Sequence, residues 1–192
     1  KTTRNEISKG SSVRGVVISE EFYYFIVFMT NSFLRPTESE VFAVKFEDIK
    51  VKDNPKTLEI RVDGKTGFRT ASTMPNAVDF YNRLIELRPD YKTEDFLFFN
   101  DYPNRTTAIK NFNRIFNHIL GVAGLKTTKE GTPRTAYALR HYALQTRLIK
   151  SKGKVNIFNL AKNAGTSVEQ LERFYLKNIE LNEELVRNLQ TF

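Results

Sequence analysis

The spacing of apolar side chains predicts a helical chain interrupted by one small sheet. Ser19-Glu20-Glu21 is an N-terminal capping sequence, and the aromatic residues after it predict a helix that reaches about Phe33. Pro36 suits the first turn of a second helix over residues 37–43. From Leu58 to Val62, apolar residues occupy every second position, which is the period of a half-buried strand.

Two further strands are predicted beside this one. Asp63-Gly64 is a turn sequence, residues 68–73 read as the returning strand, and residues 46–52 read as a third strand. This hairpin places Lys65 at its tip, where a long cationic side chain can project into a groove. A three-stranded antiparallel sheet is the expected result.

Helical periodicity dominates the chain after Pro75. Gly165 suits the C-terminal cap of one of these helices, and Thr166-Ser167-Val168-Glu169 is a capping box that begins the next. The predicted fold class is therefore α+β, mostly helical, with the small sheet packed against helices. The predicted helices are 77–88, 109–120, 134–150, 156–163, a short one ending at Tyr175, and a final amphipathic one with Leu181, Leu185, Leu189 and Phe192 on one stripe.

Composition favours a nucleic-acid partner. Among 192 residues, 30 are Lys or Arg and 22 are Asp or Glu, which gives a net charge of +8. With 40% hydrophobic residues the chain can bury a sizeable core. It has no cysteine and two histidines, so a disulfide framework and a zinc ribbon are excluded and a histidine-rich metal site is disfavoured.

The chain shows no secretory signal, and its most apolar segment, residues 22–29, is far shorter than the ~20 residues of a membrane span. We therefore expect a cytoplasmic protein that does not enter a membrane. Residues 1–14 are polar and basic and read as a linker or arm from a missing N-terminal DNA-clamping domain. Residues 15–178 form the expected main domain, and residues 179–192 form a terminal helix that packs internally or docks on a neighbouring protomer.

Candidate chemistry is concentrated in a basic segment between Gly131 and Val168 that contains no acidic residue. A cationic surface with an arginine near a tyrosine suits reactions of a phosphodiester, because guanidinium binds the anion and a phenol can attack it. The basic residues of this segment are Arg134, Arg140, Arg147, Lys150, Lys152, Lys154 and Lys162.

Four motifs in this order resemble the catalytic domain of the tyrosine recombinase (phage integrase) family. The resemblance covers the chain from about residue 15 onward. The motifs are Phe33-Leu34-Arg35-Pro36-Thr37-Glu38 with Phe46-Glu47-Asp48-Ile49, similar to "G-x-R-x-x-E … W-x-D-I"; Gly64-Lys65-Thr66-Gly67, similar to "K-T-G"; Tyr137-Ala138-Leu139-Arg140-His141, similar to "H-x-L-R-H"; and Ala164-Gly165-Thr166-Ser167 with Tyr175, similar to "L-G-H-S … Y".

The resemblance implies DNA strand cleavage and rejoining through a 3′-phosphotyrosyl intermediate, without a metal or other cofactor. Arg35 and Arg140 would hold the scissile phosphate, Tyr175 would be the nucleophile, and Lys65 would protonate the leaving oxygen. Glu38 would orient its neighbours. Double-stranded DNA is the implied partner, bound also by Arg134, Arg147, Lys150, Lys152 and Lys154.

The family further implies a protein that is monomeric in solution, assembles into a synaptic tetramer on DNA, and is bacterial or phage-borne and nucleoid-associated. Two positions depart from the family pattern: Tyr137 replaces a histidine, and Thr166 replaces a histidine or tryptophan. A free phenol has a pKa near ~10, so only about 0.1% of Tyr175 is ionised at pH 7 without a base. Tyr137, itself a neutral phenol, is poorly suited to supply one.

Other interpretations of these residues remain open. Tyr137 lies three residues before Arg140 and could simply orient its guanidinium, and Thr166 is explained by an N-capping role. We interpret His141 as structural, or as a residue that supports the groups in contact with the phosphate, because it points about 100° away from Arg140 around the helix. Tyr175 taken alone could be a core residue. The alternative functions are a catalytically silent DNA-binding relative and, less favoured, a type IB topoisomerase.

Overall fold

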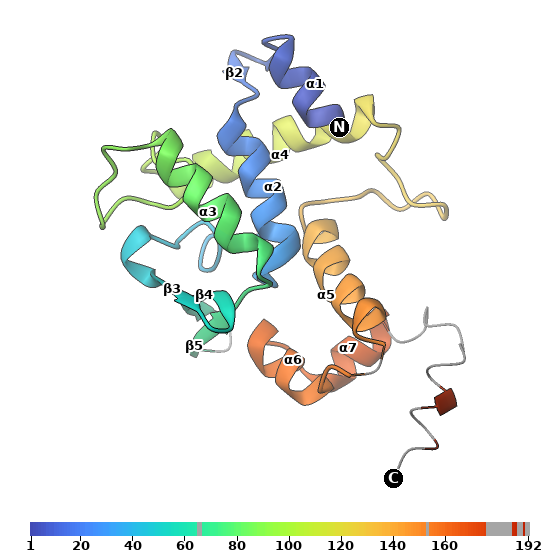
Figure 1. Ribbon diagram of the computed structural model, residues 1–192. Coiled ribbons are helices and arrows are strands. Elements are labelled where there is room, and N and C mark those ends of the chain that lie inside the picture. The colour runs from blue at the N-terminus through green and yellow to red at the C-terminus, as the bar shows by residue number, and fades with distance from the viewer. Residues whose placement is uncertain (65–66, 153, 176–185, 188–189, 191–192) are drawn as a thin grey trace.

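The computed structural model describes residues 1–64, 67–152, 154–175, 186–187 and 190; for residues 174 and 175 it describes the backbone. The predicted mostly helical α+β fold is confirmed (Figure 1). In chain order the elements are α1 (Thr2–Ser8), β1 (Ser12–Val13), β2 (Val16–Val17), α2 (Glu20–Ser32), the 3-10 turn η1 (Phe46–Asp48), β3 (Ile49–Asp53), β4 (Lys56–Gly64), β5 (Gly67–Ser72), α3 (Asn76–Leu87), α4 (Arg105–Val122), α5 (Tyr137–Ser151), α6 (Ile157–Ala164) and α7 (Val168–Tyr175).

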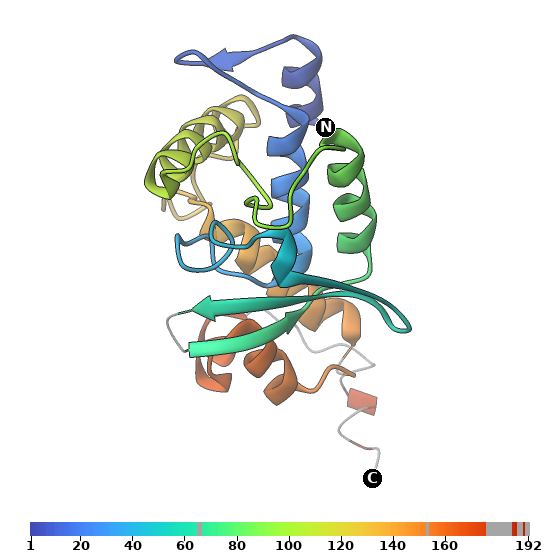
Figure 2. The same ribbon diagram turned by 90° about the vertical axis from the view of Figure 1, so that its left-hand side faces the viewer.

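Helix α2 runs through the middle of the molecule (Figures 1 and 2). It begins where the sequence predicted, because the Ser19 hydroxyl accepts a hydrogen bond from the backbone N–H of Phe22 at 3.3 Å. Phe22, Phe25 and Phe28 recur at helical spacing and are fully buried. The ring of Phe25 lies 4.5 Å from that of Phe112 on α4, so these aromatic residues join α2 to α4 in the main core.

The antiparallel sheet has the order β3-β4-β5, as predicted. Leu58, Ile60 and Val62 of β4 are buried, which is the face expected from their alternation. The central strand pairs Ile60 with Ile49 of β3 and with Ala71 of β5. The first strand starts three residues later than predicted, because residues 46–48 form η1 instead.

A second, smaller core joins α5, α6 and α7. Phe33, which follows α2 in the left-handed conformation at φ 60°, is buried in this core, and Met74 packs against it. This left-handed residue ends α2. The chain thus passes from the second core at Phe33 to the main core at Leu34.

The predicted helix over residues 37–43 is wrong, because this segment forms consecutive turns. The backbone N–H of Phe42 bonds to the Thr37 carbonyl and that of Val41 bonds to the Arg35 carbonyl, both at 3.3 Å, which is not the helical pattern. Val41 and Phe42 are both buried although adjacent, and the carboxylate of Glu40 also points inward. A regular helix would carry at least one of these side chains to the surface.

Much of the segment predicted as a linker or arm is folded. Helix α1 contacts α2 and α4, and residues 12–17 form a short hairpin. Glu6 of α1 bonds to Lys9 at 2.9 Å and to His118 of α4 at 3.3 Å. A connection from residues 1–14 to another domain remains a prediction.

Within the described residues, no helix combines the length and apolarity that crossing a bilayer demands. Most of the predicted terminal helix lies outside the described residues.

Candidate functional site

One cavity of about 610 Å³ collects side chains from three separate segments of the chain. The loop after α2 contributes Arg35, helix α5 contributes Arg140, and the start of α7 contributes Gln170. The cavity thus brings together Arg35 and Arg140, the two predicted phosphate-binding arginines, which lie more than a hundred positions apart in the sequence. Its lining residues are Arg35, Thr37, Ser39, Glu40, Tyr137, Arg140, His141, Leu144, Thr166 and Gln170.

Glu40 is the acidic residue at the centre of this site. Its side chain is fully buried, and its carboxylate bonds to the side chain of Arg35 and, at 2.8 Å, to the backbone N–H of Arg35. Arg69 of β5 contacts the same carboxylate at 2.9 Å and 3.3 Å. Glu38, which the resemblance implied would orient its neighbours, is exposed and accepts a hydrogen bond from the Thr106 hydroxyl at 3.4 Å, and it is Glu40 that bonds to Arg35.

Three successive carbonyl groups at the end of α6 each accept a hydrogen bond from a different arginine. Arg69 Nε donates to the carbonyl of Asn163 at 3.3 Å. Arg140 Nη2 donates to that of Ala164 at 2.8 Å, and Arg35 Nη2 donates to that of Gly165. These carbonyls form the negative end of the helix dipole, which attracts cations.

This arrangement leaves the site with excess positive charge. Arg35 and Arg69 share the single buried carboxylate of Glu40, so these three side chains together carry one positive charge in excess. Burial, the largest single influence, raises the pKa of Glu40, but hydrogen bonds from Arg69 and Arg35 outweigh it, and the net pKa is lowered below 4.5. Glu40 is therefore ionised at neutral pH, and the cavity suits an anion such as a phosphate.

Arg140 is held at both ends of its guanidinium. The residue is only 5% exposed, and its Nη1 donates to the carbonyl of Phe33, which connects α5 to the end of α2. Its guanidinium therefore joins α5 both to the end of α2 and to the end of α6.

Tyr137 and His141 lie one helical turn apart on α5 and both line the cavity. Their ring centroids are 6.3 Å apart. Burial, reinforced by the charge of Arg140, lowers the pKa of His141 below 6.5, so its imidazole is neutral at neutral pH. The angle from Arg140 alone had left His141 as either a structural residue or one that supports the site from behind, and the structure places it in the cavity lining. Its i+4 relation to Tyr137 was the signal that could have located it.

Thr166 lines the cavity, but it is not the cap of α7. The Ser167 hydroxyl accepts the hydrogen bond from the backbone N–H of Gln170 at 3.1 Å, which makes Ser167 the N-capping residue. The expected capping role of Thr166 is therefore wrong. Gly165 ends α6 in the left-handed conformation at φ 62°, as predicted, and turns the chain toward α7.

For the two remaining catalytic candidates, Tyr175 and Lys65, the structure describes neighbouring residues but not the side chains themselves. Tyr175 is the last residue of α7, the helix that packs on α5 and α6 and begins beside the cavity, and its side chain lies outside the described atoms. Lys65 lies outside the described residues. Gly64 and Gly67 pair at the end of the hairpin that carries it.

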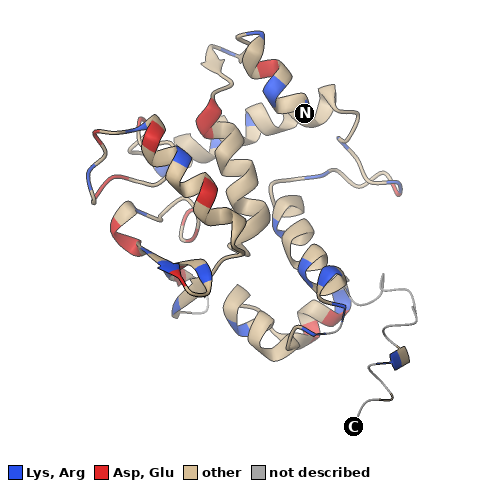
Figure 3. Cartoon of the chain, viewed as in Figure 1, with Lys and Arg blue, Asp and Glu red and all other residues tan. Residues whose placement is uncertain are grey.

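The basic residues predicted to bind DNA occupy different environments. Figure 3 shows Lys and Arg along α5 and near its end. Lys150, Lys152 and Lys154 are exposed there. Arg134 instead donates hydrogen bonds to the carbonyls of Leu125, at 3.0 Å, and Thr127, so its guanidinium holds the loop before α5.

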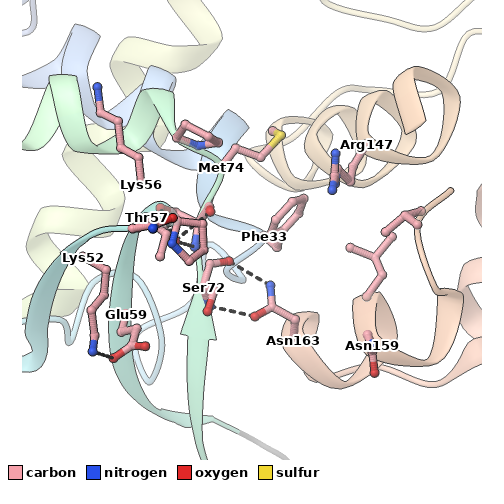
Figure 4. A pocket seen from close by; sticks show the side chains of 16 residues that line it. Phe33, Lys52, Lys56, Thr57, Glu59, Ser72, Met74, Arg147, Asn159 and Asn163 are labelled. Carbon is pink, nitrogen blue, oxygen red and sulfur yellow. Dashed lines mark hydrogen bonds and ion pairs between the residues drawn. The ribbon is translucent and has the colours of Figure 1, made fainter. Parts of the chain in front are cut away.

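Arg147 lines a second cavity, of about 670 Å³, between the sheet and helices α5 and α6 (Figure 4). Phe33 and Met74 lie in its middle, and Lys52 and Lys56 stand on the strand side. On the opposite side Asn163 bonds to Ser72. No group of three or more potential metal ligands occurs among the described residues.

Comparison with solved structures identifies the fold. The crystal structure of XerA recombinase matches with a TM-score of 0.58 and 17% identity over 98% of this chain and 61% of that one. The Tn1549 transposon integrase in complex with circular intermediate DNA matches with a TM-score of 0.58 and 18% identity, over 98% and 62%. XerH site-specific recombinase bound to a palindromic difH substrate matches with a TM-score of 0.60 and 14% identity, over 98% and 50%.

These matches show that the chain has the fold of a tyrosine recombinase catalytic domain, as its motifs predicted. The chain spans between half and about three fifths of the length of the three proteins. No protein-family model and no curated protein sequence matches it.

Proposed function

We propose that this chain is the DNA-cleaving part of a site-specific tyrosine recombinase of the integrase type. The observation that supports this most is the convergence of Arg35 and Arg140 on one cavity with excess positive charge. Two guanidinium groups on one side of a cavity can bind the non-bridging oxygens of a phosphodiester through charge-assisted hydrogen bonds. These contacts strengthen as negative charge builds up in the transition state.

In the proposed reaction, the phenol oxygen of Tyr175 attacks the scissile phosphorus and the bond to the 5′ oxygen breaks. The phenol gives its proton to solvent water, the leaving oxygen gains one from Lys65, and the 3′ end of the DNA stays joined to the protein. Attack by a 5′ hydroxyl on the phosphotyrosine reverses these steps and rejoins a strand. Tyr137 and Thr166 would donate hydrogen bonds to the phosphate.

The partner we propose is double-stranded DNA, lying against Lys150, Lys152 and Lys154 with further contacts from Arg134 and Arg147. DNA is present in the solved complexes of the Tn1549 integrase and XerH, whose folds this chain shares. Recombination of two sites also requires self-association, and a tetramer on DNA at the bacterial nucleoid belongs to this proposal.

A second candidate function is a DNA-binding relative that does not cleave. It is favoured by the two departures at Tyr137 and Thr166, which replace groups that the family uses for proton transfer and phosphate contact. The phosphate site would persist in such a protein, because Arg35 bonds to Glu40 and the Gly165 carbonyl, and Arg140 bonds to the Phe33 and Ala164 carbonyls.

Covalent trapping separates the two candidates. Nicked duplexes that tile the DNA flanking the gene release a short fragment on cleavage, which prevents rejoining and leaves the protein attached to DNA. A recombinase gives a covalent complex that survives denaturation on at least one duplex. DNA binding without any such complex favours the silent relative, and the absence of both binding and attachment would reject both candidates.

A further inference from the structure

Arg69 is absent from the lining of the 610 Å³ cavity but is bonded to residues that form it. Its side chain is 11% exposed, and both of its Nη atoms contact the buried carboxylate of Glu40. The same carboxylate holds the backbone and the side chain of Arg35. Arg69 therefore contacts Glu40, and Glu40 in turn contacts the Arg35 guanidinium at the cavity.

Arg69 also fixes the end of α6 to strand β5. Its Nε donates to the carbonyl of Asn163, while the side chain of Asn163 bonds to the backbone N–H and carbonyl of Ser72 at 2.7 Å and 2.9 Å (Figure 4). The two attachments lie on the same strand. They hold in place the carbonyl of Gly165, to which Arg35 donates.

Two glycines show how closely this group is packed. A Cβ atom on Gly165 would lie 2.7 Å from Arg69 Cζ, and one on Gly64 would lie 2.5 Å from Glu40 Oε1. Gly64 immediately precedes Lys65 and Gly165 immediately precedes Thr166. The Arg69–Glu40 pair thus packs against the backbone at Gly64 and at Gly165, and each of these glycines precedes a proposed site residue.

We propose that Arg69 is a positioning residue that holds Arg35 in its phosphate-binding orientation, acting through Glu40 and the end of α6. This inference rests on the proposed function for its consequence in cleavage, but not for the orientation of Arg35 itself. Arg35 lies in the irregular segment between α2 and η1 and carries a long side chain, so the orientation of its guanidinium depends on two acceptors, Glu40 and the Gly165 carbonyl. Arg69 is bonded to the first and braces the second.

The first test observes Arg35 directly in the DNA-free full chain. Nitrogen-15 NMR of arginine side chains reports rotation of a guanidinium group, and the Arg35 signals are assigned by their loss in Arg35→Lys. Arg69→Ala and Arg69→Lys should both shift these signals and speed the rotation of the Arg35 guanidinium. A lysine keeps the charge but cannot contact both oxygens of Glu40 and the Asn163 carbonyl together, so it decides the question if the alanine variant unfolds.

The matched control is Arg61→Ala. Arg61 lies on the neighbouring strand β4, its side chain is 69% exposed, and its partners are Asp48 and the Glu47 carbonyl. This change should leave the Arg35 signals where they are. Unchanged Arg35 signals in a folded Arg69 variant would overturn the inference.

The second test uses single-turnover cleavage of the trapping duplex. Arg69→Ala should slow cleavage about tenfold to a hundredfold with little change in DNA affinity, as expected when a phosphate-binding group is misplaced. In an Arg35→Ala background the same change should cost little more, because both act through one group. A full, multiplicative loss in that background contradicts the inference. If the wild-type chain forms no covalent complex, the proposed function fails, and the NMR experiment still decides the role of Arg69.

Discussion

Replacing Glu40 with glutamine removes the negative charge on which two arginines depend while keeping the shape of the side chain. The carboxylate accepts hydrogen bonds from the backbone and side chain of Arg35 and from both Nη atoms of Arg69. A glutamine has one oxygen to offer, and its NH2 group would face a second set of donors. Arg35 and Arg69, whose side chains are 17% and 11% exposed, would then lack a counter-charge.

The expected loss of stability follows from this burial. Removing one partner of a buried ion pair costs about 3–5 kcal/mol, because the charge left behind is poorly solvated. For a chain of this size, that loss lowers the melting temperature by roughly 6–20 °C. An exposed ion pair would contribute far less, typically below about 1 kcal/mol.

Urea unfolding followed by circular dichroism measures this difference, with Glu38→Gln as the matched control. Glu38 is exposed and two positions away, so its replacement should change the free energy of unfolding by about 0.5 kcal/mol or less. The Glu40 contribution is present above pH 4.5 and is lost as the pH falls toward the lowered pKa of the folded state. Equal stability of the two variants at pH 7 would refute the role assigned to Glu40.

Two further predictions concern pH and salt. The pKa of His141 is lowered below 6.5 in the folded protein, so the unfolded chain binds its proton more tightly and the free energy of unfolding should fall as the pH drops below about 6.5. Melting curves recorded from pH 5 to 8 measure this fall in stability, and His141→Gln should abolish it. An unchanged pH dependence in this variant would contradict the burial assigned to His141. DNA affinity should weaken with salt, with a log–log slope of about −0.9 per neutralised phosphate, and charge reversal at Lys152 and Lys154 should make that slope shallower. A salt-independent affinity would argue against the end of α5 as the DNA face.

The sequence predicted the regular elements well because their signals are local. The Ser19 cap and the apolar spacing of α2, and the alternation along β4, each depend on neighbouring residues, and the structure confirms them. The convergence of Arg35 with Arg140 was predicted through the family motifs. Local patterns do not bring two such distant positions together.

The acidic partner was missed because motif spacing assumes regular structure. Glu38 stands at the family distance from Arg35, but turns over residues 36–43 bring Glu40 to the arginine instead. In these turns the side chains of Glu40, Val41 and Phe42 are all buried, which is a tertiary effect. Propensity and the presence of Pro36 could not reveal it.

The position of Arg69 in its strand was a sequence signal that could have identified it as a buried charged residue. It lies two residues before Ala71, and its cross-strand partner is Val62. Both of these residues are buried, so Arg69 occupies the core-facing register of its strand. A charged residue at such a position requires a buried partner, and the strand pattern alone was enough to raise that question.

The central claim is that Tyr175 forms the bond to DNA, and it is tested by covalent trapping with Tyr175→Phe. This change keeps the ring and removes the oxygen, so covalent complexes should disappear while DNA affinity stays nearly constant. Tyr142→Phe is the control, because Tyr142 is 57% exposed on α5 and absent from the cavity lining, and its covalent complexes should persist. Peptide mapping of the wild-type complex should place the nucleotide on Tyr175. Covalent complexes that persist in Tyr175→Phe, or a nucleotide mapped to another residue, would contradict the account.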